Sequence, residues 1–135
     1  MNYNKRAGSL YEQMFITEAM FRGIDISTTI GDYSPYDCII DNGKKLLRIQ
    51  VKGTASPQRS GYKVTVAKGN SMGQKIPRGP NCFDYLAAVV MTGADSHWYI
   101  VPESKIANQM SVKFFPSPLS KAKFEKYKHG WDLIC

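Results

Sequence analysis

Three polar residues, Asp37, Gln50 and Lys52, have the types and spacing of a site that could hold a metal ion and hydrolyse a phosphodiester. A hard divalent cation such as Mg²⁺ takes oxygen ligands, and Asp37 and Gln50 offer a carboxylate and an amide carbonyl. A backbone carbonyl nearby, with Val51 as the candidate, would add another oxygen. Such a metal polarises a phosphoryl oxygen and lowers the pKa of a bound water. Lys52 could orient that water or offset charge in the transition state.

The spacing has a geometric meaning, because two apolar segments, YDCII (36–40) and LLRIQV (46–51), flank the turn sequence DNGKK. An Asn-Gly pair between such segments is a strong hairpin signal. Side chains alternate along a strand, so Gln50 and Lys52 share a polar face. If the turn closes the hairpin, Asp37 lies opposite the end of the second strand. An acid, an amide and a lysine would then converge at one end of the hairpin.

Glu12 is a fourth candidate with two interpretations, and it falls in a segment of helical length and composition, residues 9–22. In the first interpretation Ser9 is the N-cap and Glu12 bonds back to its amide as a capping box. In the second, the helix starts earlier, at Asn4, and Glu12 lies inside it on an apolar face. A carboxylate there needs a partner, which a metal or Lys52 could supply.

The charge of the chain is strongly positive and unevenly distributed. The formal net charge is +7, and no acidic residue occurs between Asp41 and Asp84. Localised positive charge favours a polyanion such as a phosphate backbone as partner. The alternative is that these side chains are only solvated. The candidates for DNA binding are Arg59, Lys63, Lys68, Lys75 and Arg78, and a second basic cluster comprises Lys121, Lys123, Lys126 and Lys128.

The remaining pattern predicts a helix, several strands and a final helix, which is an α/β fold with a mixed sheet. Residues 83–91 form a continuous apolar run, typical of a central strand buried on both faces. A Pro and Gly-rich stretch at 69–81 indicates a loop. The other expected elements are strands at 62–67, 97–102 and near 111–115, a short helix near 103–109, and a helix at 117–130 with Ser117 as N-cap and Gly130 as C-cap.

The bulk properties indicate one domain, residues 1–135, with no apolar run near the roughly 18 residues of a membrane span. The N-terminus has basic residues but no apolar stretch behind them, so we expect no secretory signal. Three cysteines with no CxxC pair favour reduced thiols in a cytoplasmic compartment. His97 and His129 have no ligand-like spacing and are expected to be strand or cap residues.

The motif PYD (35–37), followed after twelve residues by QVK (50–52), resembles the PD-(D/E)xK nuclease signature, with a Tyr inserted and Gln in the acid's place. The helix with Glu12 and the segments FDYLAAVV, WYIVP and FEKYKHGWDLI also resemble this family, so the likeness covers nearly the whole chain. The most similar branch is that of the small intron-associated homing endonucleases, in which Gln is usual at this position.

The resemblance implies a restriction-endonuclease-like core, with a mixed central β-sheet flanked by helices. It also implies Mg²⁺-dependent cutting of double-stranded DNA by a homodimer or homotetramer, with Mn²⁺ able to substitute, in a bacterial or phage-type context. In the family, a Glu on the first helix contributes to the metal site, which favours that role for Glu12.

Two other functions stay open on the sequence. A junction-resolving nuclease that acts on branched DNA would use the same active-site residues. A DNA-binding protein on a decayed nuclease scaffold would also fit, because the neutral amide of Gln50 holds a cation less strongly than a carboxylate.

Overall fold

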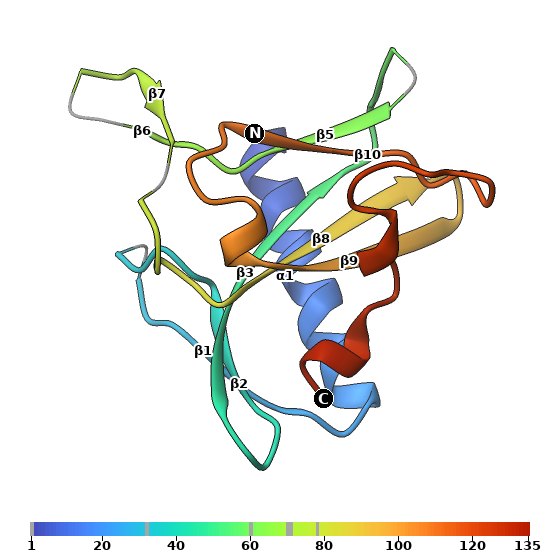
Figure 1. Ribbon diagram of the computed structural model, residues 1–135. Helices are drawn as coiled ribbons and strands as arrows, with labels where there is room; N and C mark the ends of the chain where they lie inside the picture. Colours follow the sequence, from blue (N-terminus) through green and yellow to red (C-terminus); the bar gives the residue numbers. More distant parts are fainter. Residues whose placement is uncertain (1, 32, 60, 70–71, 78) are drawn as a thin grey trace.

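The computed structural model describes residues 2–31, 33–59, 61–69, 72–77 and 79–135, and its centre is a five-stranded mixed sheet (Figure 1). The order of the strands is β1-β2-β3-β8-β9, in which β3 and β8 are parallel and the other pairs antiparallel. The bounds are Asp25–Thr28 for β1, Cys38–Asp41 for β2, Leu46–Thr54 for β3, Tyr85–Thr92 for β8 and Asp95–Pro102 for β9. The predicted α/β fold with a mixed sheet is confirmed.

The predicted hairpin is formed by β2 and β3, with Cys38 opposite Ile49. The turn is held by its own side chains: the Asp41 carboxylate accepts from the Gly43 amide at 2.9 Å, and Asn42 Oδ1 accepts from the next two amides. Gly43 has φ of +85°, a left-handed conformation that glycine adopts without a steric penalty. This turn fixes the register, and with it the position of Asp37 one residue before β2.

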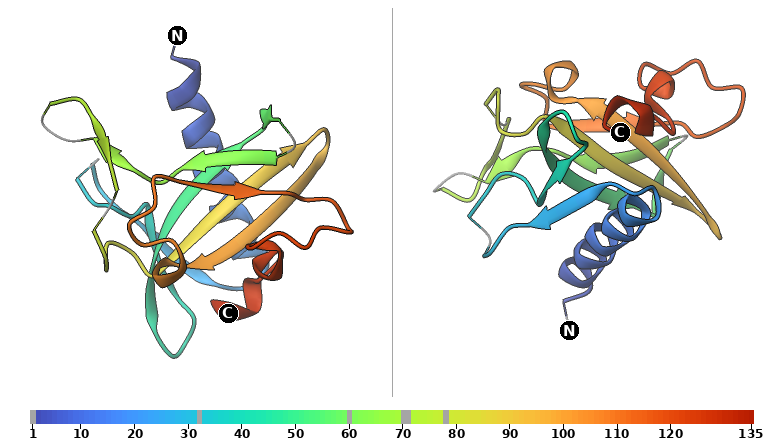
Figure 2. Two further views of the ribbon diagram at one scale, coloured as in Figure 1. Left: turned by 45° about the horizontal axis from the view of Figure 1, so that its top comes forward. Right: turned by 90° about the horizontal axis from the view of Figure 1, so that it is seen from below.

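The helix α1, Tyr3–Phe21, covers one face of this sheet (Figure 2). Its N-cap is Asn2, whose side chain accepts from the Lys5 amide at 3.1 Å. Ser9 therefore lies within the helix and the capping-box interpretation of Glu12 is wrong. The buried side of α1 carries Phe15, whose ring centroid lies 5.6 Å from that of Trp98 and 5.5 Å from that of Trp131.

The opposite face is covered by a second, three-stranded sheet in the order β10-β5-β4. The bounds are Ser111–Phe114 for β10, Gly61–Thr65 for β5 and Pro57–Gln58 for β4. Strand β8 is buried between the two layers as predicted: Ala87 and Val89 face α1, and Leu86, Ala88 and Val90 face the small sheet. A separate ribbon, β6 (Lys68–Gly69) with β7 (Lys75–Ile76), lies in the predicted loop region.

Two predicted helices are wrong in the structure. The segment 117–130 contains turns and one short 3-10 helix, η2 (Glu125–Tyr127), and a further one, η3 (Trp131–Leu133), follows it. The chain is held extended beside β9 by a bridge between Tyr99 and Lys128, and His129 adopts φ of +55°, so tertiary packing overrides local helix signals. The helix expected near 103–109 shortens to η1, Glu103–Lys105.

Arg48 and Asp84 connect β3 to the start of β8. The Asp84 carboxylate accepts from the Arg48 amide at 2.7 Å and from the guanidinium Nη2 at 3.2 Å. Burial raises the pKa of Asp84, but the hydrogen bonds and charge of Arg48 lower it by more. The pKa of Asp84 therefore lies below its ordinary value. This ion pair helps to set β3 and β8 in register. Within the described parts of the chain, no helix is long and apolar enough to cross a membrane.

Candidate active site

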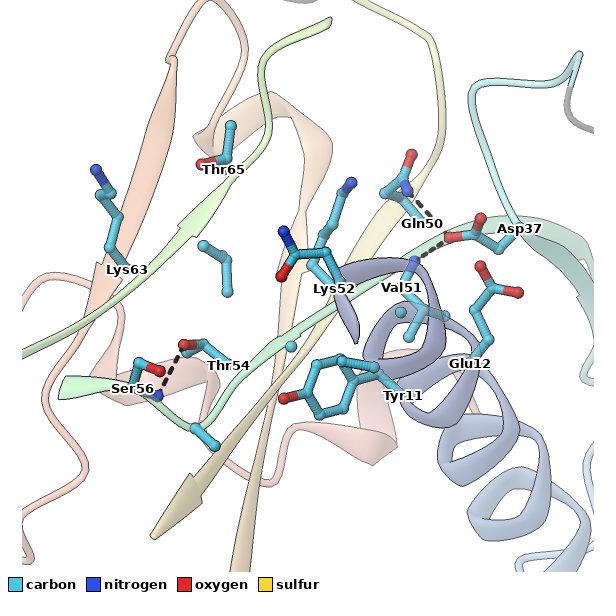
Figure 3. Close-up of a pocket in the computed structure, with 16 residues that line it drawn as sticks. Tyr11, Glu12, Asp37, Gln50, Val51, Lys52, Thr54, Ser56, Lys63 and Thr65 are labelled. Atoms are coloured by element: carbon cyan, nitrogen blue, oxygen red, sulfur yellow. Dashed lines mark hydrogen bonds between the residues drawn. The ribbon is translucent and has the colours of Figure 1, made fainter. Parts of the chain in front are cut away.

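The predicted site residues come from three elements and line one cleft of about 500 Å³ (Figure 3). Glu12 comes from α1, Asp37 from the residue before β2, and Gln50, Val51 and Lys52 from β3. Alternation along β3 directs Gln50 and Lys52 to one side, as predicted, while Val51 packs into the core against α1. The structure thus brings together all the residues predicted for catalysis and for the metal.

The Asp37 carboxylate is oriented by the returning strand. Its Oδ2 accepts from the Val51 amide at 2.6 Å and from Gln50 Nε2 at 3.0 Å. The Asp37 amide in turn donates to the Ile49 carbonyl at 2.8 Å. Because the N–H and C=O of one strand residue point to the same edge, the Val51 carbonyl also points toward the Asp37 side. A carboxylate and a backbone carbonyl therefore face one space.

Gln50 is the one buried polar or charged residue among those described, with 5% of its surface exposed. Its Nε2 bonds to Asp37, whereas Oε1 is buried without a hydrogen-bond partner among the described residues. Rotating the amide would set Oε1 against a carboxylate oxygen, so this assignment of the two atoms is the favourable one. A buried acceptor without a partner costs about 1–3 kcal/mol. Gln50 is therefore buried at a cost in stability, which a role in binding would explain.

Glu12 lies in the middle of α1, where it is exposed and lines two adjoining hollows. The second hollow, of about 210 Å³, is also lined by Asp37, so both carboxylates face the same region. The negative charge of both carboxylates affects the pKa of the buried Cys38 thiol. Burial, and then the negative charges of Asp37 and Glu12, raise the pKa of Cys38 to about 12, so the thiol stays protonated at neutral pH.

The donor set of this cleft fits a hard divalent cation better than zinc. It offers two carboxylates, an amide oxygen without a partner in the described parts of the chain and a backbone carbonyl, which are the oxygen ligands that Mg²⁺ prefers. Across the described residues, no group of three His, Cys, Asp or Glu side chains could hold a metal. Any metal here would therefore depend on Gln50 and the backbone as well as on Asp37 and Glu12.

Tyr11 and Gly53 are among the cleft residues that the sequence analysis did not assign to the site. A Cβ on Gly53 would lie 2.4 Å from the Tyr11 ring, so the missing side chain lets α1 approach β3 at the residue after Lys52. Helical spacing could have identified two other residues that line the cleft. Asn4 and Gly8 lie eight and four residues before Glu12 and so share its face of α1.

The four predicted DNA-binding residues that lie in described parts of the chain come from separate elements. Lys63 on β5 lines the cleft. Arg59 lies beyond β4 with φ of +56°, and Lys75 is exposed on β7 in the separate ribbon. Lys68 is placed on β6, and Arg78 lies outside the described residues. Among the described residues of this set, Lys63 is the one that lines the cleft with the catalytic candidates.

The two histidines lie apart from the residues that line the cleft. The His97 ring pairs with Thr92 Oγ1 at 2.9 Å across the β8–β9 hairpin. Burial and the positive charge of Lys128 lower the pKa of His97 below its ordinary value. His129 occupies a left-handed position near the C-terminus and donates its amide to the Trp98 carbonyl at 2.6 Å. Both are placed as strand or turn residues.

Comparison with known proteins identifies the family and supports the fold. Residues 2–134 match a family model for PD-(D/E)XK endonucleases. The structure of a bacterial homing endonuclease, I-Ssp6803I, is similar, with a TM-score of 0.81 and 25% identity over 96% of this chain and 91% of that chain. The structure of MepB shares only the fold, with a TM-score of 0.52 and 15% identity over 84% of this chain and 86% of that one. No curated protein matches. The resemblance in the sequence is confirmed, and the chain belongs to the PD-(D/E)XK endonuclease family.

Proposed function

We propose that this protein is a Mg²⁺-dependent endonuclease that hydrolyses phosphodiester bonds of double-stranded DNA at specific sites. The observation that carries the proposal is the buried Gln50, whose Oε1 has no partner among the described residues and which lies beside Asp37 in a cleft shared with Glu12. A protein that kept only its fold would gain nothing from burying such an acceptor. A decayed scaffold is therefore the weaker alternative.

The metal would be held by Asp37, Gln50 Oε1, the Val51 carbonyl and Glu12. Mg²⁺, or Mn²⁺ in its place, supplies Lewis acidity when bound, which polarises the phosphoryl oxygen and lowers the pKa of a water. The protein's part is to fix these oxygens in advance. The Val51 amide and Gln50 Nε2 hold the Asp37 carboxylate, and the hairpin holds Gln50 and Val51 on a rigid strand.

Lys52 is the proposed catalytic cation. It lies two residues after Gln50 on the same side of β3 and lines the same cleft. In this position its ammonium orients the attacking water and offsets the negative charge that builds on the phosphate in the transition state. Lys52 is only partly exposed, so water screens this interaction less than it would at an open surface.

A DNA substrate is supported by the family and by charge, and site specificity by the likeness to a homing endonuclease. The family consists of endonucleases, and I-Ssp6803I, which this chain resembles over almost its whole length, is a bacterial homing endonuclease. The net charge of +7 favours a polyanionic substrate. We therefore propose a homing-type role in the cytoplasm of a bacterium, with the protein acting as a homodimer or homotetramer.

Cleavage assays with matched variants test the proposal. The wild type should cut duplex DNA from a target library with Mg²⁺ or Mn²⁺ and not with EDTA. Asp37→Ala and Lys52→Ala should each lose on the order of 10³-fold or more in rate, while DNA affinity in EDTA stays within several-fold. His97→Ala, a change outside the cleft, should cut like the wild type.

The outcomes separate the competing functions. Full activity of Asp37→Ala or Lys52→Ala would refute the assigned site. DNA binding by a wild type that cuts no member of the library would favour the decayed scaffold. Cutting of four-way junctions with no cutting of linear duplexes would favour a junction-resolving nuclease.

A further inference from the structure

The outward face of the small sheet carries two lysines directly opposite each other, Lys63 on β5 and Lys113 on β10. Both side chains are exposed, while their neighbours Val64 and Val112 are buried against β8. The next pair on this outward face is Thr65 with Ser111, because side chains alternate along each strand. Two cations and two hydroxyls thus form one polar surface, here called the Lys63–Lys113 face.

The strands that form this face contain no carboxylate to balance its charge. No acidic residue occurs between Asp41 and Asp84 or between Glu103 and Glu125, and these intervals contain every strand of the small sheet. Neither lysine takes part in an ion pair with any described residue. Like charges directly opposite across two strands destabilise a sheet. An anionic partner would remove that repulsion.

The Lys63–Lys113 face continues the wall of the catalytic cleft. Lys63 and Thr65 line the same cleft as Glu12, Asp37 and Gln50, and Figure 3 shows Lys63 on β5, across the cleft from Asp37. Neighbouring strands are about 4.8 Å apart, so Lys113 lies one strand farther from the cleft. A polyanion seated in the cleft would therefore extend over this face.

We propose that the Lys63–Lys113 face binds the phosphodiester backbone of duplex DNA next to the phosphate that is cut. This inference rests on the proposed function and adds a contact residue, Lys113, together with a path for the DNA. Successive charges on one strand of a duplex are separated by about 3.4 Å along its axis, so the two long side chains can reach adjacent phosphates. Thr65 and Ser111 supply hydroxyl donors along the same path.

A double substitution with an equal change in charge tests the surface. Lys63→Ala/Lys113→Ala removes two charges from the face, and Lys44→Ala/Lys45→Ala removes two from the exposed turn at the opposite end of β3. Each variant has a net charge of +5, from the wild-type +7 minus two. Affinity for one linear duplex is measured in EDTA at several salt concentrations, alongside thermal unfolding to confirm that each variant is folded.

The Lys63→Ala/Lys113→Ala variant should bind more weakly, and the plot of log affinity against log salt should be shallower by about 2, since each phosphate contact contributes about 0.9. The Lys44→Ala/Lys45→Ala variant should keep the wild-type slope. Equal slopes for the two variants would refute the role of the Lys63–Lys113 face in DNA binding. A wild-type slope in Lys63→Ala/Lys113→Ala would refute it as well.

Cleavage by the wild type in Mg²⁺ is scored separately from these slopes. If the wild type cuts DNA but the slopes are equal, the Lys63–Lys113 face is refuted and the nuclease stands. If the slopes differ as expected but the wild type never cuts, the face stands and the catalytic proposal fails.

Discussion

At the scale of single residues, the unusual feature is that Gln50 is buried at a cost. Its Oε1 lacks a partner among the described residues, while Nε2 serves the Asp37 carboxylate. Losing the Nε2 bond to the charged carboxylate should cost about 1.5–3 kcal/mol, and removing the acceptor that lacks a described partner should return about 1–3 kcal/mol. The two effects are similar in size, so folding gives Gln50 no clear advantage over an apolar side chain of similar shape, and binding explains the residue better.

Replacing Gln50 by Met tests this balance, since Met is flexible, apolar and of similar volume. In EDTA, Gln50→Met should have a free energy of unfolding within about 1 kcal/mol of the wild type, because the lost bond and the removed acceptor offset each other. Metal-dependent cutting should be lost. Urea unfolding and a cleavage assay measure the two effects, and Gln58→Met at an exposed position should change neither. A Gln50→Met protein that is several kcal/mol less stable yet still cuts would contradict the role assigned here.

The sequence was a good guide to Asp37, Gln50 and Lys52 and a poorer one to Glu12. Strand alternation and one strong turn place the first three, because both are local rules. The role of Glu12 depended on where α1 begins. Ser9 and Asn4 both resemble caps, but the cap is Asn2, and nothing local distinguishes three such polar residues. Glu12 lies in the cleft because α1 packs against β3, which is a long-range contact that local sequence does not show.

At the scale of elements, the contact between Tyr11 and Gly53 joins the two segments that carry the site. Tyr11 precedes Glu12 on α1, and Gly53 follows Lys52 on β3. Any Cβ at Gly53 would lie between 2.4 and 2.7 Å from three ring atoms of Tyr11, so the helix or the ring would have to move. The chain offers a control in Gly61 on β5, where a Cβ would lie 2.6 Å from the Phe115 ring.

Gly53→Ala should therefore weaken metal binding, because it displaces Glu12 from the other ligands. We expect at least a tenfold loss in Mn²⁺ affinity by titration calorimetry, and a matching loss of cutting at limiting metal. Gly61→Ala should lose comparable stability, about 1–3 kcal/mol, through the same overpacking, yet keep its metal affinity. In a Glu12→Ala background, Gly53→Ala should have little further effect on metal affinity. Equal metal affinity in Gly53→Ala and Gly61→Ala would show that the contact serves packing alone.

The elements that the sequence predicted well are those fixed by neighbouring residues. The β2–β3 hairpin and the buried strand β8 follow from turn residues and apolar runs. The small sheet could not be placed, because β5 and β10 pair across 45 residues or more of intervening chain. The helix predicted at 117–130 was wrong for a related reason. Its cap-like Ser117 and Gly130 were local signals, whereas the burial of Phe124 and Tyr127 against the second core is a long-range one.

At the scale of the whole molecule, one cleft per chain sets a limit on what a single copy can do. The two strands of a duplex are antiparallel, so one set of Asp37, Gln50 and Lys52 faces only one scissile phosphate at a time. A double-strand break therefore calls for two copies related by a two-fold axis, which is the commonest symmetry of protein oligomers. The positive charge of each copy, +7, would repel a second copy, and the phosphates of the DNA would offset that repulsion.

Mixed oligomers would reveal this division of labour. A wild-type copy and an Asp37→Ala copy with different tags are expressed together and purified over both tags, and the product is given supercoiled plasmid that carries one target. We expect nicked circles, because only one strand meets an intact site, whereas oligomers of two tagged wild-type copies should give linear DNA.

Sedimentation velocity of the untagged protein should show a dimer or a tetramer. Linear product from the mixed oligomers at the wild-type rate would mean that one cleft cuts both strands in turn. A monomer that makes double-strand breaks at the concentrations assayed would rule out the paired arrangement.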